Sequence, residues 1–336
     1  MSTVWRPSRR QVLIAGGLTS GLFALGGGFN LAAAHGLQTR QRAGLAFGTT
    51  ISFKAVHKDA DRLEAGLDPA WAEIVRVEEA ASLFRPESAL SRLNREGVLE
   101  NPPAALLEML ELSQRAARLT SGAFDVTVQP LWSLYANAFA SGQAPSDDEL
   151  AAVRDLVGYE NIVIEASRIV LKKRGMALTL NGIAQGYATE QCLRVLREHG
   201  ITDAFLNTGE IGVAGKRDDK QLWTAAIADP RDGNGYVALT HPLSGILSTS
   251  GDYATAFTSD FAAHHIFDPS TLRSPPELAS VSVLAQSGGL SDALATAMMV
   301  MGAEKSLQLA QSLEGVEVFL VTKQGARKST QGFPSV

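Results

Sequence analysis

Two oxygen-bearing side chains share one face of a segment that otherwise predicts a short buried helix. The segment runs from Gly289 to Gly302, and within it Asp292 and Thr296 lie one helical turn apart. A carboxylate and a hydroxyl on one face suit a hard cation such as Mg²⁺, which takes oxygen ligands. The alternative, which the segment alone favours, is structural: Asp292 interacts with the helix dipole and Thr296 bonds back to a backbone carbonyl.

A hydroxyl-rich stretch, Ser248-Thr249-Ser250-Gly251-Asp252, precedes this segment. It predicts a loop whose donors can hold phosphate oxygens, although similar stretches are common in polar turns. His264 and His265 follow it, with Asp268 close behind. A histidine can act as a general base near neutral pH. A zinc site would need further ligands at suitable spacing, which the sequence does not offer.

Two glycine-marked stretches lie further upstream. In the first, Gly122 to Leu131, Phe124 beside Asp125 suits an aromatic ligand with a polar edge, although an ordinary connection reads the same way. In the second, Leu178 to Ala188, a strand turns into a helix whose free N–H groups favour an anion. Together these features indicate a metal-dependent enzyme acting on a phosphate bond, or a nucleotide binder. Composition does not separate the two.

The composition predicts a globular protein and argues against nucleic-acid binding. Of the 336 residues, 45% are hydrophobic and 19% charged, so the chain can bury a sizeable core. The first 34 residues carry three arginines and no acid, so the remainder carries a net charge of −8, against −5 for the whole chain. A nucleic-acid binder needs a basic face instead. The single cysteine, Cys192, excludes an intramolecular disulfide and a cysteine-based metal cluster.

The N-terminal stretch resembles a twin-arginine (Tat) export signal. Arg9 and Arg10 precede an uncharged, glycine-rich run that ends in Ala32-Ala33-Ala34, a typical signal-peptidase site. The alternative is an uncleaved signal anchor. We therefore expect a signal peptide over 1–34 and one domain over 35–336. The mature protein would be periplasmic or associated with the inner membrane, without lasting insertion after cleavage.

The order of predicted elements favours an α+β fold with antiparallel or mixed sheets, because no regular βαβ rhythm is present. Helices are expected from Asp68 to Phe84, Asn101 to Gly122, Asn181 to His199 and Gly289 to Gly302, with a capping box starting another at Ser146. Strands are expected at 47–57, 161–165, 169–173, 176–180, 203–207, 222–228, 236–240, 245–248, 265–267, 280–285 and 316–322.

Seven short motifs, taken in order, resemble the ApbE family of FAD:protein FMN transferases over 47–322. They are Phe47-Gly48-Thr49, Ser88 to Asn94, Gly122 to Asp125, Ile183 to Ala188, Ser248 to Asp252, His265 to Pro269 and Asp292 to Thr296. Each motif is modest alone, and the seven in order are specific. The exported context is similar to NosX-type members, which serve the membrane flavoprotein of the nitrous oxide reduction system.

The resemblance implies a T-fold-related fold with two lobes around an FAD cleft. It also implies an Mg²⁺-dependent reaction in which a Thr or Ser hydroxyl of a partner protein attacks the FMN-side phosphorus of FAD. AMP leaves, and FMN remains on the partner as a phosphoester. The implied partner is an exported or membrane flavoprotein, for a NosX-type member a NosR-type membrane protein.

The resemblance also assigns residues. Asp292 and Thr296 resemble the side-chain Mg²⁺ ligands, and Gly182 would supply a backbone carbonyl. His265 is the candidate base that activates the incoming hydroxyl. The positions expected to bind FAD are Phe47, Phe84, Ala123, Phe124, Asp125, Thr179, Gln185, Ser250 and Phe267.

Several positions depart from the family pattern and motivate two alternatives. Ala295 stands where some members have a second aspartate, and Gly209-Glu210 replaces Gly-Gly-Asp. Further departures are Phe47 for methionine, Thr179 for an acid, Gln185 for lysine or glutamate, and Leu272 for glycine. The alternatives are a non-catalytic FAD-binding or flavin-delivery protein and an FAD pyrophosphatase in which water replaces the acceptor hydroxyl.

Overall fold

An eight-stranded antiparallel sheet forms the centre of the protein, whose computed structural model describes residues 36–218 and 220–335. The predicted leader, 1–34, lies outside the described residues. In spatial order the strands are β1 (Gln38–Ala46), β2 (Thr49–His57), β6 (Asp203–Asn207), β7 (Ile211–Ala214), β10 (Gly245–Gly251), β11 (Leu278–Ala285), β12 (Glu317–Thr322) and β13 (Arg327–Ser329). Neighbours in the sheet follow one another in chain order, and the predicted α+β class is confirmed.

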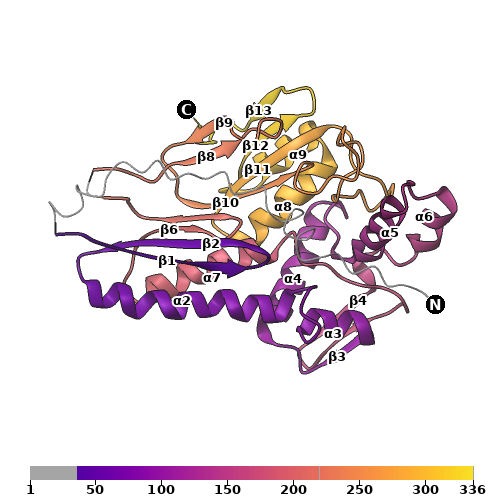
Figure 1. The fold of residues 1–336 in the computed structure, drawn as a ribbon, viewed down its shortest axis with the longest axis horizontal. Helices are drawn as coiled ribbons and strands as arrows, with labels where there is room; N and C mark the ends of the chain where they lie inside the picture. Colours follow the sequence, from indigo (N-terminus) through magenta and orange to yellow (C-terminus); the bar gives the residue numbers. More distant parts are fainter. Residues whose placement is uncertain (1–35, 219, 336) are drawn as a thin grey trace.

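Helices cover one face of this sheet (Figure 1). Strand β2 buries alternate residues there, Ile51, Phe53 and Ala55, as a strand with one face toward a core should. The helices that meet this face are α2 (Ala60–Ala81), α7 (Ala184–Glu198), α8 (Gly288–Met301) and α9 (Ala303–Ser312). The main hydrophobic core therefore lies between the sheet and these helices.

A two-stranded ribbon, β8 (Ala225–Ala228) with β9 (Tyr236–Thr240), covers the opposite face. The strand side chains that point away from the helices pack against this ribbon. Val56 of β2, Leu247 of β10 and Phe319 of β12 form one hydrophobic cluster with Trp223 and Ile227. The central strands are thus buried on both faces, which explains why β11 reads as an almost continuous apolar run.

The long connection between β2 and β6 also carries the remaining elements, most of which lie to the right of or below α8 in Figure 1. They are α3 (Ala89–Glu96), β3 (Val98–Glu100), α4 (Ala104–Leu119), α5 (Gln129–Ala140), α6 (Asp147–Arg154), β4 (Ile162–Glu165) and β5 (Arg168–Leu171), with two 3₁₀ turns at 126–128 and 159–161. The predicted capping box at Ser146 is confirmed.

Some predicted boundaries were wrong. Helix α2 begins after Asp59, whose side chain accepts from Asp61 and Arg62 N–H, so Pro69 lies inside the helix instead of at its start. The stretch after Gly122 is a 3₁₀ turn and a helix, because Asp125 caps it. Residues 176–180 and 265–267 are loop, and β10 continues to Gly251.

Within 36–218 and 220–335, none of the helices combines the length and the apolar character needed to cross a bilayer.

Candidate active site

Helices α7 and α8 cross in close contact at two glycines, Gly186 and Gly288. A Cβ atom on Gly186 would lie 2.7 Å from Cβ of Asp292 and closer still to the Gly288 carbonyl oxygen, so a larger residue does not fit there. Glu190 of α7 fixes the crossing, since its carboxylate accepts from Gly288 N at 2.7 Å and from Ser287 Oγ at 3.1 Å. The start of α8 is therefore held against α7.

This crossing places Asp292 of α8 beside the first turn of α7. Its Oδ2 accepts from Gly186 N at 3.0 Å, and the side chain is only 4% exposed. Burial raises the pKa of Asp292 to about 7. Glu210 is also buried, and burial together with the charge of Asp292 raises its pKa well above the usual range. Neither carboxylate has an ion-pair partner among the described residues.

Thr296, one turn further along α8, meets two other segments. Its Oγ1 lies 3.0 Å from Ser250 Oγ of β10. It also lies 2.8 Å from where a Cβ of Gly182 would be, so the turn before α7 passes directly over it. Phe124 lies 3.4 Å from the same point. Gly182, Ser250 and Thr296, far apart in sequence, thus converge one helical turn from Asp292.

The donor set in this region suits a hard cation. The two buried carboxylates without a cationic partner, the hydroxyl of Thr296 and the adjacent loop backbone at Gly182 are all oxygen donors, the ligands that Mg²⁺ prefers. Across the described residues no three His, Cys, Asp or Glu side chains group as metal ligands. The residues present therefore fit Mg²⁺.

The hydroxyl-rich stretch is the end of strand β10 and not the expected loop. Ser248 Oγ bonds Ser291 Oγ at 2.7 Å, and Thr249 Oγ1 bonds Ser282 Oγ at 2.8 Å, so these two hydroxyls join β10 to α8 and β11. Only Ser250 of the three directs its hydroxyl to Thr296. Of this stretch, Ser250 alone remains a candidate for phosphate binding.

The ring of His265 lies in the loop that follows β10. Its Nδ1 is 3.1 Å from the carbonyl oxygen of Thr255, which can only accept, so Nδ1 carries the proton and Nε2 keeps the lone pair. Burial lowers the pKa of His265, opposed in part by this bond and by the charge of Asp252. The ring is neutral at pH 7 and has a basic nitrogen, as a general base requires.

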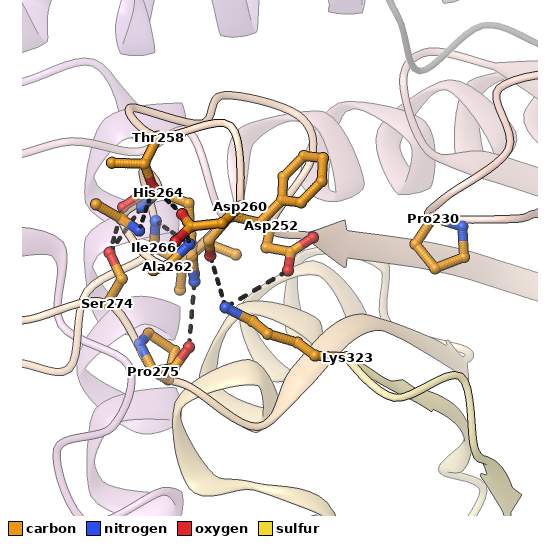
Figure 2. Close-up of polar contacts among 12 residues, drawn as sticks. Pro230, Asp252, Thr258, Asp260, Ala262, His264, Ile266, Ser274, Pro275 and Lys323 are labelled. Atoms are coloured by element: carbon orange, nitrogen blue, oxygen red, sulfur yellow. Dashed lines mark hydrogen bonds and ion pairs between the residues drawn. The ribbon is translucent and has the colours of Figure 1, made fainter.

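His264, by contrast, has a structural role. It is fully buried, its Nε2 contacts the Pro275 carbonyl at 3.3 Å, and its own backbone bonds Ser274 through both N–H and C=O (Figure 2). Burial lowers the pKa of His264 to about 4. The family resemblance had singled out His265 as the candidate base, and the buried contacts of His264 give that neighbour a structural role.

Glu78, near the end of α2, contacts Phe47 directly and contacts Arg85, the residue that follows Phe84. Glu78 accepts from Phe47 N at 2.9 Å and pairs with Arg85, the neighbour of Phe84, at 2.6 Å. Phe47 has a left-handed φ of 51° in the turn between β1 and β2, a conformation that disfavours a large side chain. The ring of Phe84 is 71% exposed and available for stacking.

The other positions expected to bind FAD fall into different environments. Asp125 is buried and uses both oxygens internally, for Thr127 and for Tyr159 N, and burial raises its pKa. Gln185 donates to the Thr208 carbonyl at 3.1 Å, next to Glu210. Phe267 is 4% exposed and lies in an aromatic cluster, where the centre of its ring is 4.6 Å from the centre of the Tyr135 ring. Ala123 and Thr179 are half-buried near Phe124 and Gly182 along the chain.

Sequence reasoning missed Glu190 as the clamp of the two helices and Glu210 as the neighbour of Asp292. Nothing in the local pattern marks Glu190, an ordinary helical residue. Glu210 stood out only as a departure from the Gly-Gly-Asp pattern, and its position beside Asp292 depends on the packing of β7 against α7 and α8.

Comparisons with known proteins show which family the chain resembles in sequence and fold. The model of a family described as the ApbE family matches residues 47–320. A relative from Vibrio cholerae, FAD:protein FMN transferase, is 31% identical over 294 residues, covering 84% of this chain and 86% of the relative. The flavin transferase ApbE structure from Vibrio cholerae superposes with a TM-score of 0.75 at 28% identity, covering 89% of this chain and all of that one. The apo flavinyl transferase ApbE of Pseudomonas stutzeri gives a TM-score of 0.75 at 28% identity, covering 88% and 95%.

Proposed function

The chain belongs to the ApbE family, and from that premise we propose that it is an FAD:protein FMN transferase. The observation that carries the proposal is the convergence of Gly182, Ser250 and Thr296 one helical turn from Asp292. These are the residues that a metal-assisted displacement at a pyrophosphate would use. Relatives of this name align over most of both chains, so the proposal rests on more than a shared motif.

Asp292, Thr296 and the Gly182 carbonyl would hold Mg²⁺, with Glu210 adding negative charge nearby. Bound there, the ion would neutralise charge on the FAD pyrophosphate and on the departing phosphate. Ser250 would orient a phosphate oxygen through its hydroxyl, whereas the N–H of Gly186 in the first turn of α7 already donates to Asp292.

His265 would activate the acceptor. Its Nε2 takes the proton of a Thr or Ser hydroxyl, and the hydroxyl oxygen forms a bond to the FMN-side phosphorus of FAD. The bond from that phosphorus to the bridging oxygen breaks, and AMP leaves with the electron pair. The product is FMN joined to the acceptor by a phosphoester, and the protonated ring returns its proton to solvent.

The flavin and adenine parts of FAD would rest against Phe47, Phe84, Ala123, Phe124 and Asp125, with Thr179, Gln185 and Phe267 lining the same site. The exposed ring of Phe84 supports this placement, because an aromatic ring left open at a site edge can stack on a ligand.

We further propose that the chain works in the periplasm, free or at the inner membrane, on an exported or membrane flavoprotein such as a NosR-type protein. The Arg9-Arg10 leader pattern supports export. The acceptor is not written in this sequence, and a neighbouring gene for a membrane flavoprotein would identify it.

One assay tests the proposal. The protein without its leader is incubated with FAD, Mg²⁺ and a candidate acceptor domain, and flavin fluorescence is followed on a denaturing gel. Fluorescent acceptor supports the transferase. Free FMN and AMP without labelling would indicate the pyrophosphatase, and unchanged bound FAD would indicate the flavin-delivery protein.

A further inference from the structure

A fully buried carboxylate, Asp252, lies at the start of the loop that carries His265. Arg231, from the turn between β8 and β9, donates two hydrogen bonds of 2.7 Å to it, one to each carboxylate oxygen. Lys323, at the end of β12, places its Nζ 3.7 Å from Asp252 Oδ2. Three elements distant in sequence thus meet at one buried charge.

Both cations also contact the tip of the loop. Lys323 Nζ donates to the backbone carbonyl of Phe261 at 2.6 Å, and the Arg231 guanidinium lies 4.3 Å from the centre of the Phe261 ring. Figure 2 shows Lys323 extending between Asp252 and the segment around Asp260 and Ala262. Phe261 has a left-handed φ of 58°, so its backbone needs such outside support.

Backbone hydrogen bonds close the loop between its two ends as a hairpin. Phe257 N donates to the Ala263 carbonyl at 2.8 Å, and Ala256 pairs with His264. His265 N and Nδ1 both contact the Thr255 carbonyl, at 3.0 and 3.1 Å. The direction of the His265 ring is therefore fixed by where this hairpin sits.

We propose that Asp252 is a positioning residue for His265, which acts by gathering Arg231 and Lys323 so that they anchor the tip of the 254–265 hairpin. Without the carboxylate, the partly exposed Arg231 and the largely buried Lys323 would lose the ion-pair partner that they share, and each would turn toward water. Phe261 would lose both contacts, and the imidazole would lose its fixed direction. The kinetic part of this inference rests on the proposed transferase activity, whereas the structural part does not.

The decisive variant is Asp252→Asn, which keeps the shape and removes the charge. We expect kcat for FMN transfer to fall on the order of 10- to 100-fold, the range for a misplaced catalytic group, while the Kd for FAD stays within about twofold. The matched control is Asp147→Asn. It removes an exposed ion pair in which Asp147 Oδ1 lies 2.6 Å from Arg273 Nη2. Its kcat should equal that of the unaltered protein.

Two substitutions of Lys323 form a second test, with a smaller expected loss of kcat. Lys323→Met removes the donor to Phe261 and should lower kcat with the Kd for FAD unchanged, and Lys323→Arg should restore most of the loss. In all variants two measurements report the state of the hairpin directly. One is the NMR resonance of the His265 ring, which is assigned by its loss in His265→Gln, and the other is amide hydrogen exchange of residues 254–265. A shifted resonance and faster exchange are expected for Asp252→Asn and Lys323→Met alone.

The outcomes separate this inference from the proposed function. If Asp252→Asn and Lys323→Met keep full kcat, or leave the His265 resonance and amide exchange unchanged, the positioning role is wrong. If the unaltered protein labels no acceptor but both variants shift the resonance and the exchange, the positioning role stands and the transferase proposal fails.

Discussion

At the scale of single residues, the most informative feature is a pair of carboxylates buried side by side. Burial raises the pKa of both Asp292 and Glu210, the charge of Asp292 raises that of Glu210 further, and the described residues offer neither an ion-pair partner. Proteins avoid such pairs unless a ligand compensates the charge, and here a divalent ion would do so. The bland interpretation of Asp292 as a helix-dipole partner is therefore the weaker one.

We predict that Asp292→Ala abolishes flavin transfer, with a loss of at least about 100-fold, because the variant lacks the carboxylate that we propose as a ligand of Mg²⁺. Isothermal titration with Mg²⁺ should show no binding, while the fold persists by circular dichroism. Glu304→Ala, an exposed acid in the first turn of α9, is the control and should bind and transfer normally. Full activity in Asp292→Ala would remove the metal assignment.

His264 makes a prediction about pH and stability. Its pKa falls from 6.5 in the unfolded chain to about 4 in the folded protein. Between these values the unfolded chain binds the proton and the folded one does not, so stability is complete above pH 6.5 and is lost as the pH falls toward 4. At pH 5 the loss from this group is about 2 kcal/mol relative to pH 7.5.

Urea denaturation at pH 7.5 and 5 tests this prediction through the difference between the unaltered protein and His264→Gln. The variant lacks the titrating group, so its stability should depend less on pH by about that 2 kcal/mol. Equal pH dependence of both proteins would show that His264 is not the group responsible.

At the scale of elements, the site depends on how closely α7 and α8 approach. Alanine normally favours a helix over glycine by about 1 kcal/mol. At Gly186 the added methyl group would collide with the Asp292 side chain and the Gly288 backbone, neither of which can turn away. Overpacking of this kind costs about 1–3 kcal/mol and outweighs the gain in helix propensity.

We therefore predict that Gly186→Ala lowers the free energy of unfolding by about 2 kcal/mol and weakens Mg²⁺ binding, because the helices separate and Asp292 loses its bond to Gly186 N. Urea denaturation and Mg²⁺ titration measure the two effects. Gly233→Ala serves as the control, since nothing lies within 4 Å of its Cβ position. Unchanged stability in Gly186→Ala would mean that the helices do not cross where described.

Elements with a strong local signal could be predicted from the sequence. The capping box at Ser146 and strands such as β6 and β9 follow from capping and alternation. The start of α2 could not be predicted in this way. Asp68-Pro69 has the pattern of a helix start, but the actual N-cap is Asp59, nine residues before Asp68. Helix α9 was missed since Gly302 marks the end of α8 and the start of α9 at once.

Candidate site residues such as Asp292 and Thr296 could be named from the sequence because they lie in family motifs. Those that act by tertiary contact could not. Glu190, Arg231 and Lys323 are ordinary charged residues in sequence, and their partners lie 97, 21 and 62 positions away. Spacing along the chain contains no information about such pairs.

At the scale of the whole molecule, the leader makes a prediction of its own. We expect the double variant Arg9→Lys and Arg10→Lys to block export, because the twin-arginine pathway reads the arginine pair. Immunoblots of periplasmic and cytoplasmic fractions should show an uncleaved, cytoplasmic protein that still transfers FMN after purification. Arg6→Lys, outside the pair, is the control, and normal export of the double variant would exclude this route.

The chain order of the eight-stranded sheet bears on how the protein folds. Each strand pairs with the sheet strand that precedes or follows it, so the sheet can assemble stepwise from neighbours without threading. The β2–β6 step must first close the longest excursion, from His57 to Asp203, and the entropy cost of closing it grows slowly with length. Gly182 and Gly186 lie near the end of that excursion, and Asp292 and Thr296 lie beyond β11. The candidate site, which needs segments from this excursion and from beyond β11, is therefore expected to be among the last parts of the protein to form.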